Sequence, residues 1–404
     1  MLTFLIYNKM IKVAFLLNFP LDYKGGINYL KNLFYATHKF NKDNVEIILF
    51  VSTDIDSEYI NMFSPYCKIV KTKLLKRNSL PWFFSKVSGR LFNWDIFTYS
   101  LLERYGINIV SHSNFISPKK KIKTLNWIPD FQYVHYPDLW SDSQLKSTKD
   151  LHSNLIKNSD AIVLSSHSAF EDYKINHLNY QQKVNVLNFV SQPDQEIEVL
   201  LKNKDESLIR DTYNLHSSFF YMPNQFWSHK NHKVVFEAVK ILKNKGLNPL
   251  VVTSGLMSDY RNGNNHVENL QKFVIDNSLK ENILFLGLIP YNHVIKLILL
   301  SDCIINPSFF EGWSSTVEEA KTFGKRILLS NISVHIEQSP EFGTYFDPNN
   351  SLELSDKMEE ILRESNITEL NVEKIRSDLD DRTKIFASEY YRILIQLQKI
   401  TFKK

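Results

Sequence analysis

The chain contains 404 residues, of which 43% are hydrophobic and 23% are charged, and its formal net charge is +4. This length predicts two domains with large cores, and so small a net charge gives no indication of nucleic-acid binding. The two cysteines, Cys67 and Cys303, are too few for a disulfide framework and favour a reducing compartment.

Residues 1–9 precede the first predicted strand and carry neither a cationic leader nor a small-residue cleavage site, so we expect no secretory signal there. We also expect these residues to lie outside the fold. No apolar run reaches the length of a membrane-spanning helix, because the best stretch, residues 294–306, is interrupted by Lys296 and Asp302.

In the first half, apolar runs alternate with stretches of helical periodicity, which is typical of a doubly wound sheet of buried parallel strands. Gly25 and Gly26 follow the first predicted strand, where they would let the backbone approach a ligand closely at a helix start. A plain tight turn explains the two glycines equally well. The predicted strands are residues 11–19, 45–52, 107–111, 124–128, 161–166 and 183–190.

Asp54 and Asp56 follow the second predicted strand and form an Asp-x-Asp pattern, which can bind a divalent metal through hard oxygen ligands. The pattern is short, and Asp378 and Asp380 repeat it within a predicted helix. We therefore favour a fortuitous match and expect no metal site.

Residues 71–94 combine six Lys or Arg side chains with five aromatic residues. The wider segment 68–123 holds twelve Lys or Arg against only Asp95 and Glu103. This mixture suits an anionic membrane surface, although single-stranded nucleic acid or an ordinary basic, half-buried helix pair would have the same composition. We favour an anionic membrane surface as the partner and expect no nucleic acid.

The second half repeats the alternation of strands and helices, so a second doubly wound sheet is predicted. A polar stretch that ends near residue 212 is typical of an interdomain connection. Strands are expected at residues 218–222, 249–255 and 282–288 and from 303 onward, and amphipathic helices at 352–364 and 380–399.

The most informative stretch is CIINPSFFEGWSSTVEEAKTFGKRILL, residues 303–329, which predicts a strand, a loop, a helix and another strand. Small residues at the helix start leave its N–H groups open to an anion, which the helix dipole favours. Glu311 precedes this start, and Glu319 lies about 12 Å further along the axis, at roughly 1.5 Å per residue. A nucleotide-diphosphate sugar would fit, although two glutamates at this spacing are also typical of a solvated helix face.

The pair Glu311 and Glu319, within EGWSSTVEEAKTFGKRILLS, resembles the signature of the retaining family-4 glycosyltransferases, in particular their bacterial mannosyltransferase-like group. This resemblance implies the α/β GT-B fold, in which two doubly wound parallel-sheet (Rossmann-like) domains face each other across a cleft. Residues 1–205 would form the acceptor-side domain and 206–384 the nucleotide-sugar domain. The C-terminal helix, from about 385 to 404, would pack back on the first domain.

The resemblance also implies a set of site residues. Lys230 and the N–H groups near Trp313 would stabilise the leaving diphosphate, Glu311 would hold sugar hydroxyls, Glu319 would bind the ribose, and Asp130 would approach the sugar. Two positions depart from the family pattern, since Gln225 replaces an Arg and Pro129 replaces a His. The donor-binding set is Gly25, Gly26, Gln225, Lys230, Gly255, Ile289, Glu311, Gly312, Trp313, Ser314, Ser315 and Glu319.

The function implied is transfer of a hexose, with retention and without metal or cofactor, from a GDP- or UDP-linked sugar. The acceptor would be a saccharide or a lipid-linked saccharide in cell-surface polysaccharide assembly. We expect a cytoplasmic enzyme that can bind the inner face of the membrane. The alternatives are a metal-dependent transferase that uses Asp54 and Asp56, a non-catalytic nucleotide-sugar-binding protein and a nucleotide-sugar epimerase of GT-B shape.

Overall fold

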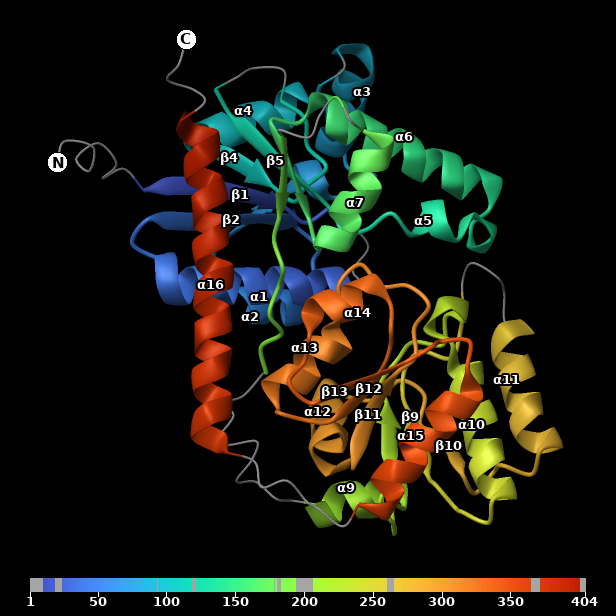
Figure 1. Ribbon diagram of the computed structural model, residues 1–404. Helices are drawn as coiled ribbons and strands as arrows, with labels where there is room; N and C mark the ends of the chain where they lie inside the picture. The colour runs from blue at the N-terminus through green and yellow to red at the C-terminus, as the bar shows by residue number, and fades with distance from the viewer. Residues whose placement is uncertain are drawn as a thin grey trace. The chain divides into compact units, whose positions relative to one another are not determined.

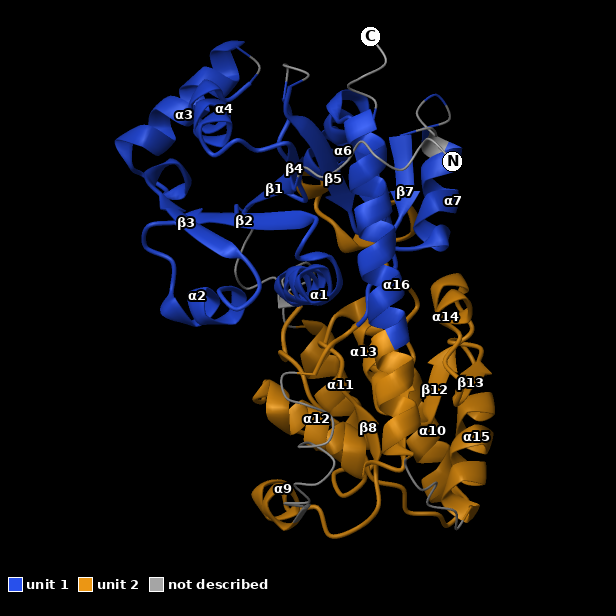
Figure 2. Cartoon of the chain, turned by 90° about the vertical axis from the view of Figure 1, so that its left-hand side faces the viewer, with its two compact units in different colours: residues 1–131, 146–190, 381–404 blue, residues 132–145, 191–380 orange. Residues whose placement is uncertain are grey.

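The computed structural model describes residues 10–18, 24–92, 94–117, 121–177, 179, 183–193, 206–259, 265–364 and 371–399. The predicted extension, residues 1–9, lies outside these ranges. The chain divides into two compact units (Figure 2). Unit 1 comprises residues 1–131, 146–190 and 381–404, and unit 2 comprises residues 132–145 and 191–380.

Unit 1 is built on a seven-stranded sheet in the order β3-β2-β1-β4-β5-β6-β7, in which every neighbouring pair is parallel (Figure 1). The prediction of a doubly wound parallel sheet is therefore confirmed. The strands are β1 Ile11–Leu16, β2 Val45–Ser52, β3 Lys68–Thr72, β4 Ile109–Ser111, β5 Lys123–Ile128, β6 Ala161–Leu164 and β7 Val184–Val186.

One strand of this sheet, β3, was not predicted from the sequence. Its residues, KIVKT, bury only Val70 well, and its lysines are typical of an edge strand, which cations protect from pairing with other chains. Such a strand lacks the continuous apolar run by which the central strands were recognised.

The helices of unit 1 connect these parallel strands. The C-terminal part of α16 packs on this unit, where Tyr390 Oη donates to Ser111 Oγ at 3.0 Å and Asn41 Nδ2 donates to the carbonyl of Ala387 at 3.0 Å. The helices are α1 Lys24–Asn41, α2 Ser57–Phe63, η1 Lys73–Leu75, α3 Leu80–Phe92, α4 Ile96–Arg104, α6 Asp142–Asn158, α7 His167–Asn176 and α16 Val372–Lys399, of which α6 and α16 cross the unit boundary.

Unit 2 contains a six-stranded sheet in the order β10-β9-β8-β11-β12-β13, again parallel throughout. Its strands are β8 Phe220–Met222, β9 Val251–Thr253, β10 Ile283–Phe285, β11 Cys303–Asn306, β12 Ile327–Ser330 and β13 Gly343–Phe346. Its helices are α5 Gln132–His135, η2 Pro137–Leu139, α9 Glu206–Tyr213, η4 Ser228–Lys230, α10 His232–Asn244, α11 Asn265–Asp276, α12 Tyr291–Leu300, α13 Ser315–Thr322, α14 Ser333–Gln338 and α15 Ser351–Arg363.

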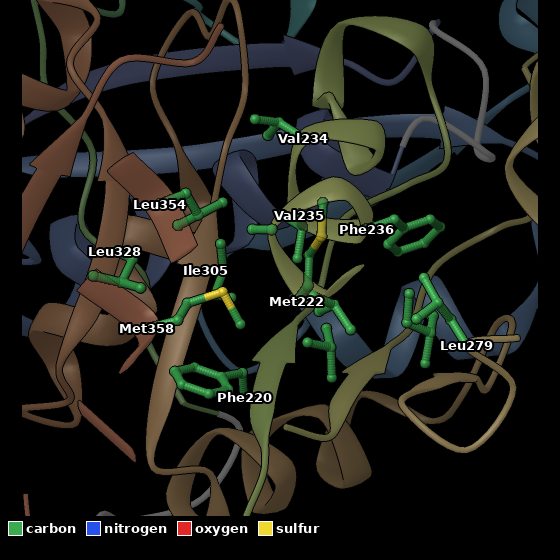
Figure 3. Packing of buried hydrophobic residues seen from close by; sticks show 14 of the residues in the cluster. Phe220, Met222, Val234, Val235, Phe236, Leu279, Ile305, Leu328, Leu354 and Met358 are labelled. Atoms are coloured by element: carbon green, nitrogen blue, oxygen red, sulfur yellow. The ribbon is translucent and has the colours of Figure 1, made fainter. Parts of the chain in front are cut away.

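The core of unit 2 lies on both faces of its sheet. Because side chains alternate along a strand, Phe220 and Met222 of β8 join one apolar cluster and Tyr221 joins the other. Figure 3 shows the first cluster, in which Met358 of α15 packs beside Phe220. A strand buried on both faces needs a continuous apolar sequence, and this explains why the central strands could be predicted.

No helix among the described residues is both long enough and apolar enough to cross a membrane.

Candidate functional site

The connectivity of unit 2 fixes where a ligand can bind. From β8, the next strands along the chain, β9 and β10, are added on one side of the sheet. Strands β11, β12 and β13 are added on the other side of β8, so the strand order reverses between β8 and β11. Ligands of doubly wound sheets bind beyond the carboxyl ends of the strands at such a reversal. Lys230 follows β8 and Glu311 follows β11, so both lie at this position.

Lys230 and Glu311 form an ion pair beyond the carboxyl ends of β8 and β11. Lys230 Nζ lies 2.6 Å from Glu311 Oε1 and 2.8 Å from Oε2, and Ser308 Oγ lies 2.7 Å from Oε1. The side chains of Lys230 and Glu311 are 15% and 9% exposed. The ammonium is therefore held in place by a carboxylate that is itself nearly buried.

The ion pair also sets the protonation state of Glu311. Burial would raise the pKa of this carboxyl, but the charge of Lys230, then His335 and the hydrogen bonds from Lys230 and Ser308, outweigh burial and hold the pKa below its ordinary value. Glu311 is thus ionised at neutral pH and can accept hydrogen bonds from hydroxyl groups.

A network of buried polar side chains lies next to the Lys230–Glu311 pair. Asn306, the last residue of β11, accepts from Asn224 Nδ2 at 3.0 Å and donates to Ser314 Oγ at 2.8 Å. Nδ1 of His335 lies 2.9 Å from the carbonyl oxygen of Ser330, so it must carry the proton and leave Nε2 as an acceptor. Burial lowers the pKa of His335 to about 4, which keeps it neutral beside the ion pair.

Helix α13 begins beside Glu311, as predicted from the small residues. Ser314 is the N-cap, and its Oγ accepts from the N–H of Val317 at 3.4 Å. The N–H of Ser314 donates to Gln338 Oε1 at 3.1 Å, and Gln338 Nε2 donates back to the carbonyl of Ser314 at 3.0 Å. Gly312 and Trp313 are half-buried and Ser315 is exposed, so the helix start is accessible at Ser315.

Glu319 lies within α13 and is buried rather than solvated. It is 8% exposed, and Tyr291 Oη donates to its Oε1 at 2.9 Å. The neighbouring Glu318 is 1% exposed and accepts from Gln338 Nε2 at 3.0 Å. The alternative that Glu311 and Glu319 belong to a solvated helix face is therefore wrong.

The loops after β8 and β9 meet at Gly255. Its φ is +145°, and a Cβ atom added there would lie 2.5 Å from the carbonyl oxygen of Asn224. Gln225, which stands in place of an Arg, uses Oε1 to accept from the N–H of Leu256 at 2.7 Å. Gln225 therefore ties these two loops together. Ile289 follows β10 and packs half-buried against the core.

Aromatic residues hold the segment just before Glu311. The N–H of Phe309 donates to the carbonyl of His229 at 2.8 Å, and Tyr136 Oη donates to the carbonyl of Phe309 at 3.3 Å. The ring of His135 lies 5.4 Å from that of Phe310. Residues 132–145, which were predicted to belong to the first domain, thus contribute to the unit 2 site.

The other predicted site residues belong to unit 1. Gly25 is exposed and Gly26 buried in the first turn of α1, and Asp130 is half-buried two residues after β5. Gly25 and Gly26 follow β1 at the reversal between β1 and β4. In unit 1, as in unit 2, predicted site residues thus follow a strand at the point where the strand order reverses.

The two aspartates of the metal-binding alternative have other partners in the structure. Asp56 caps α2 by accepting from the N–H of Glu58 at 2.8 Å, and Asp54 lies 3.8 Å from Lys76 Nζ. Across the described ranges, no group of three or more His, Cys, Asp or Glu side chains is placed to hold a metal ion.

Part of the chain is similar to a known protein family. Residues 205–378 match the family profile described as Glycosyl transferases group 1. No curated protein sequence matches the chain.

Several solved structures share the fold at low sequence identity. A glycosyltransferase from Rickettsia africae ESF-5 has a TM-score of 0.69 and 16% identity, with 96% of this chain and 99% of that chain covered. Anabaena HepE, in complex with UDP and glucose, has a TM-score of 0.61 and 13% identity, with 97% and 98% covered. WaaG, a glycosyltransferase involved in lipopolysaccharide biosynthesis, has a TM-score of 0.60 and 13% identity, with 97% and 100% covered.

These matches agree with the geometry of the two sheets. The chain has the GT-B fold of two Rossmann-like units, and its residues 205–378 are similar to the glycosyl transferases group 1 family.

Proposed function

We propose that the protein is a retaining, metal-independent hexosyltransferase that uses a nucleotide-diphosphate sugar as donor. The observation that carries this proposal is the buried Lys230–Glu311 pair at the strand-order reversal of a glycosyl transferases group 1 domain. A lone carboxylate at this depth would be costly to keep ionised, and Lys230 offsets that cost.

The roles of the residues follow from their charges. Lys230 and the N–H groups of the first turn of α13 provide positive charge at the position where a leaving diphosphate would gain negative charge. Glu311, held ionised, accepts hydrogen bonds from the sugar hydroxyls and orients the reacting carbon. Glu319, with Tyr291, binds the ribose hydroxyls. Asp130 of unit 1 contacts the sugar in this proposal.

A UDP-sugar is the first donor to test, because HepE was crystallised with UDP-glucose. A GDP-linked hexose is the second, from the resemblance to bacterial mannosyltransferases. The proposed acceptor is a saccharide or a lipid-linked saccharide in cell-surface polysaccharide assembly, the process suggested by the role of WaaG in lipopolysaccharide biosynthesis. We place the enzyme in the cytoplasm, on the inner face of the membrane.

A panel of UDP- and GDP-linked sugars tests the donor assignment. One donor should raise the melting temperature of the full chain, and Glu319→Gln should weaken that stabilisation because it removes the carboxylate charge proposed to accept from the ribose hydroxyls. With that donor, NMR of the product should show the anomeric configuration of the donor. Donor binding without transfer to any acceptor would instead favour the non-catalytic alternative.

Removal of divalent metal is expected to leave the transfer rate unchanged, because Lys230 and the α13 N-terminus supply the positive charge that a metal would otherwise provide. The measurement is the initial rate with EDTA against a magnesium-supplemented control. Asp54→Asn should also retain full activity. Loss of activity in EDTA that magnesium restores would favour a metal-dependent transferase.

A further inference from the structure

Helix α3 of unit 1 turns its small polar side chains inward. Ser85 and Ser88 are its buried residues, at 3% and 5% exposure. Ser85 Oγ donates to the carboxylate of Asp95, and Ser88 Oγ accepts from the N–H of Ile96 at 3.3 Å. A surface helix normally buries its apolar stripe, so the polarity of α3 is reversed.

The outward face of α3 carries large apolar side chains. Leu80, Phe84 and Leu91 recur at helical spacing on a single stripe, and Leu80 and Leu91 are 73% and 70% exposed. The ring centroids of Phe83 and Phe84 lie 5.9 Å apart, and those of Phe84 and Phe97 lie 6.4 Å apart. The α3 apolar face is defined as Leu80, Phe83, Phe84, Leu91 and Phe92 of α3 together with Phe97 of α4, all of them exposed. A contiguous patch of this kind marks an interaction surface.

The surroundings of this face are strongly cationic. From residue 68 to residue 92 the chain has seven Lys or Arg and no Asp or Glu. Lys86 and Arg90 lie on α3 itself, and Figure 2 shows α3 and α4 together at the upper left of unit 1, above β3 in this view. The exposed cations of this segment are Lys68, Lys71, Lys73, Arg77, Lys86 and Arg90.

We infer that the α3 apolar face docks on an anionic phospholipid bilayer. Its aromatic and leucine side chains enter the boundary between headgroups and acyl chains, and Lys86, Arg90 and the neighbouring cations contact the lipid phosphates. This partner accounts for both halves of the surface at once, since a bilayer offers a negative layer directly above an apolar one. The inference concerns unit 1 alone and does not depend on the proposed sugar transfer.

The test is flotation of the full chain with vesicles. Binding is expected to vesicles that contain phosphatidylglycerol, to weaken with added salt, and to be much weaker with phosphatidylcholine alone. The variant Phe84→Ser with Leu91→Ser should lower the partition coefficient about tenfold or more, because two large apolar groups no longer enter the lipid. Lys86→Glu with Arg90→Glu should abolish the preference for phosphatidylglycerol.

A matched control removes exposed apolar side chains elsewhere. Leu352 and Ile385 are exposed on α15 and α16, so Leu352→Ser with Ile385→Ser should bind vesicles as the unchanged chain does. Circular dichroism checks that every variant is folded. The inference is overturned if the chain does not float with phosphatidylglycerol vesicles, or if the α3 variant and the control bind alike. It is equally overturned if the α3 substitutions only dissociate a dimer, or only release an oligonucleotide, without changing lipid binding.

Discussion

Lys230→Met is expected to lower the transfer rate by roughly 10²–10³-fold, the usual effect of removing one preorganised charge partner of a transition state. The same substitution should destabilise the fold by about 3–5 kcal/mol, because it leaves the carboxylate of Glu311 buried and unpaired. The measurements are initial rates and chemical denaturation. A variant with full activity would remove Lys230 from the catalytic machinery.

The two effects of Lys230→Met can be separated by a second substitution. Adding Glu311→Gln removes the buried charge, so more than half of the lost stability should return while the transfer rate stays at least as low as in Lys230→Met. Recovery of both stability and activity would show that the pair has only a structural role. A surface ion cluster provides a control: Lys245 bridges Asp356 and Glu359 at 2.9 Å each in an exposed setting, so Lys245→Met should leave the free energy of unfolding nearly unchanged.

The stability contributed by the pair should also depend on pH. Because the pKa of Glu311 is lower in the folded than in the unfolded chain, the ion pair stabilises the fold above the ordinary pKa of a glutamate. This contribution is lost as the pH falls through the lower, folded pKa. The variant that combines Lys230→Met with Glu311→Gln should therefore lack this pH-dependent contribution to the free energy of unfolding, as measured by chemical denaturation at acid and neutral pH.

The elements that could be predicted from the sequence are those with local patterns. Continuous apolar runs located the central strands of both sheets, and the Glu-Gly-small-Glu pattern located the loop and helix that carry Glu311 and Glu319. The doubly wound fold followed from the alternation alone. The edge strand β3 was missed because Lys68 and Lys71 leave it no such run.

The hydrogen bonds that hold the site residues in place could not be predicted, because they join residues that are distant along the chain. Asn224 reaches Asn306 across 82 positions, and Tyr291 reaches Glu319 across 28. Nothing local marks His335 or Gln338 as partners of the loop that contains Ser308 and Ser314. A signal was present all the same, since Asn306 and Ser308 stand directly at the end of a buried strand, where polar residues require partners.

The packing of the loops after β8 and β9 leads to the other large expected effect. Gly255→Ala should destabilise the protein by about 3 kcal/mol or more, since it combines an unfavourable φ with overpacking. The clashing atoms, the carbonyl of Asn224 and the Cα of Gln225, are backbone and cannot rotate away. The β8 loop must then shift, and it leads directly to Lys230.

A shift of that loop should also slow transfer in the fraction of the protein that remains folded, because a displacement of about 1 Å at a positioning group can cost on the order of 10²-fold in rate. Gly246→Ala is the matched control. Gly246 also has a positive φ, +83°, but an added Cβ would meet nothing within 4 Å. Gly246→Ala should therefore lower the free energy of unfolding by about 1 kcal/mol, from backbone strain alone, and leave the transfer rate unchanged. Equal losses of stability and rate in both variants would mean that φ, and not the contact with the β8 loop, makes Gly255 necessary.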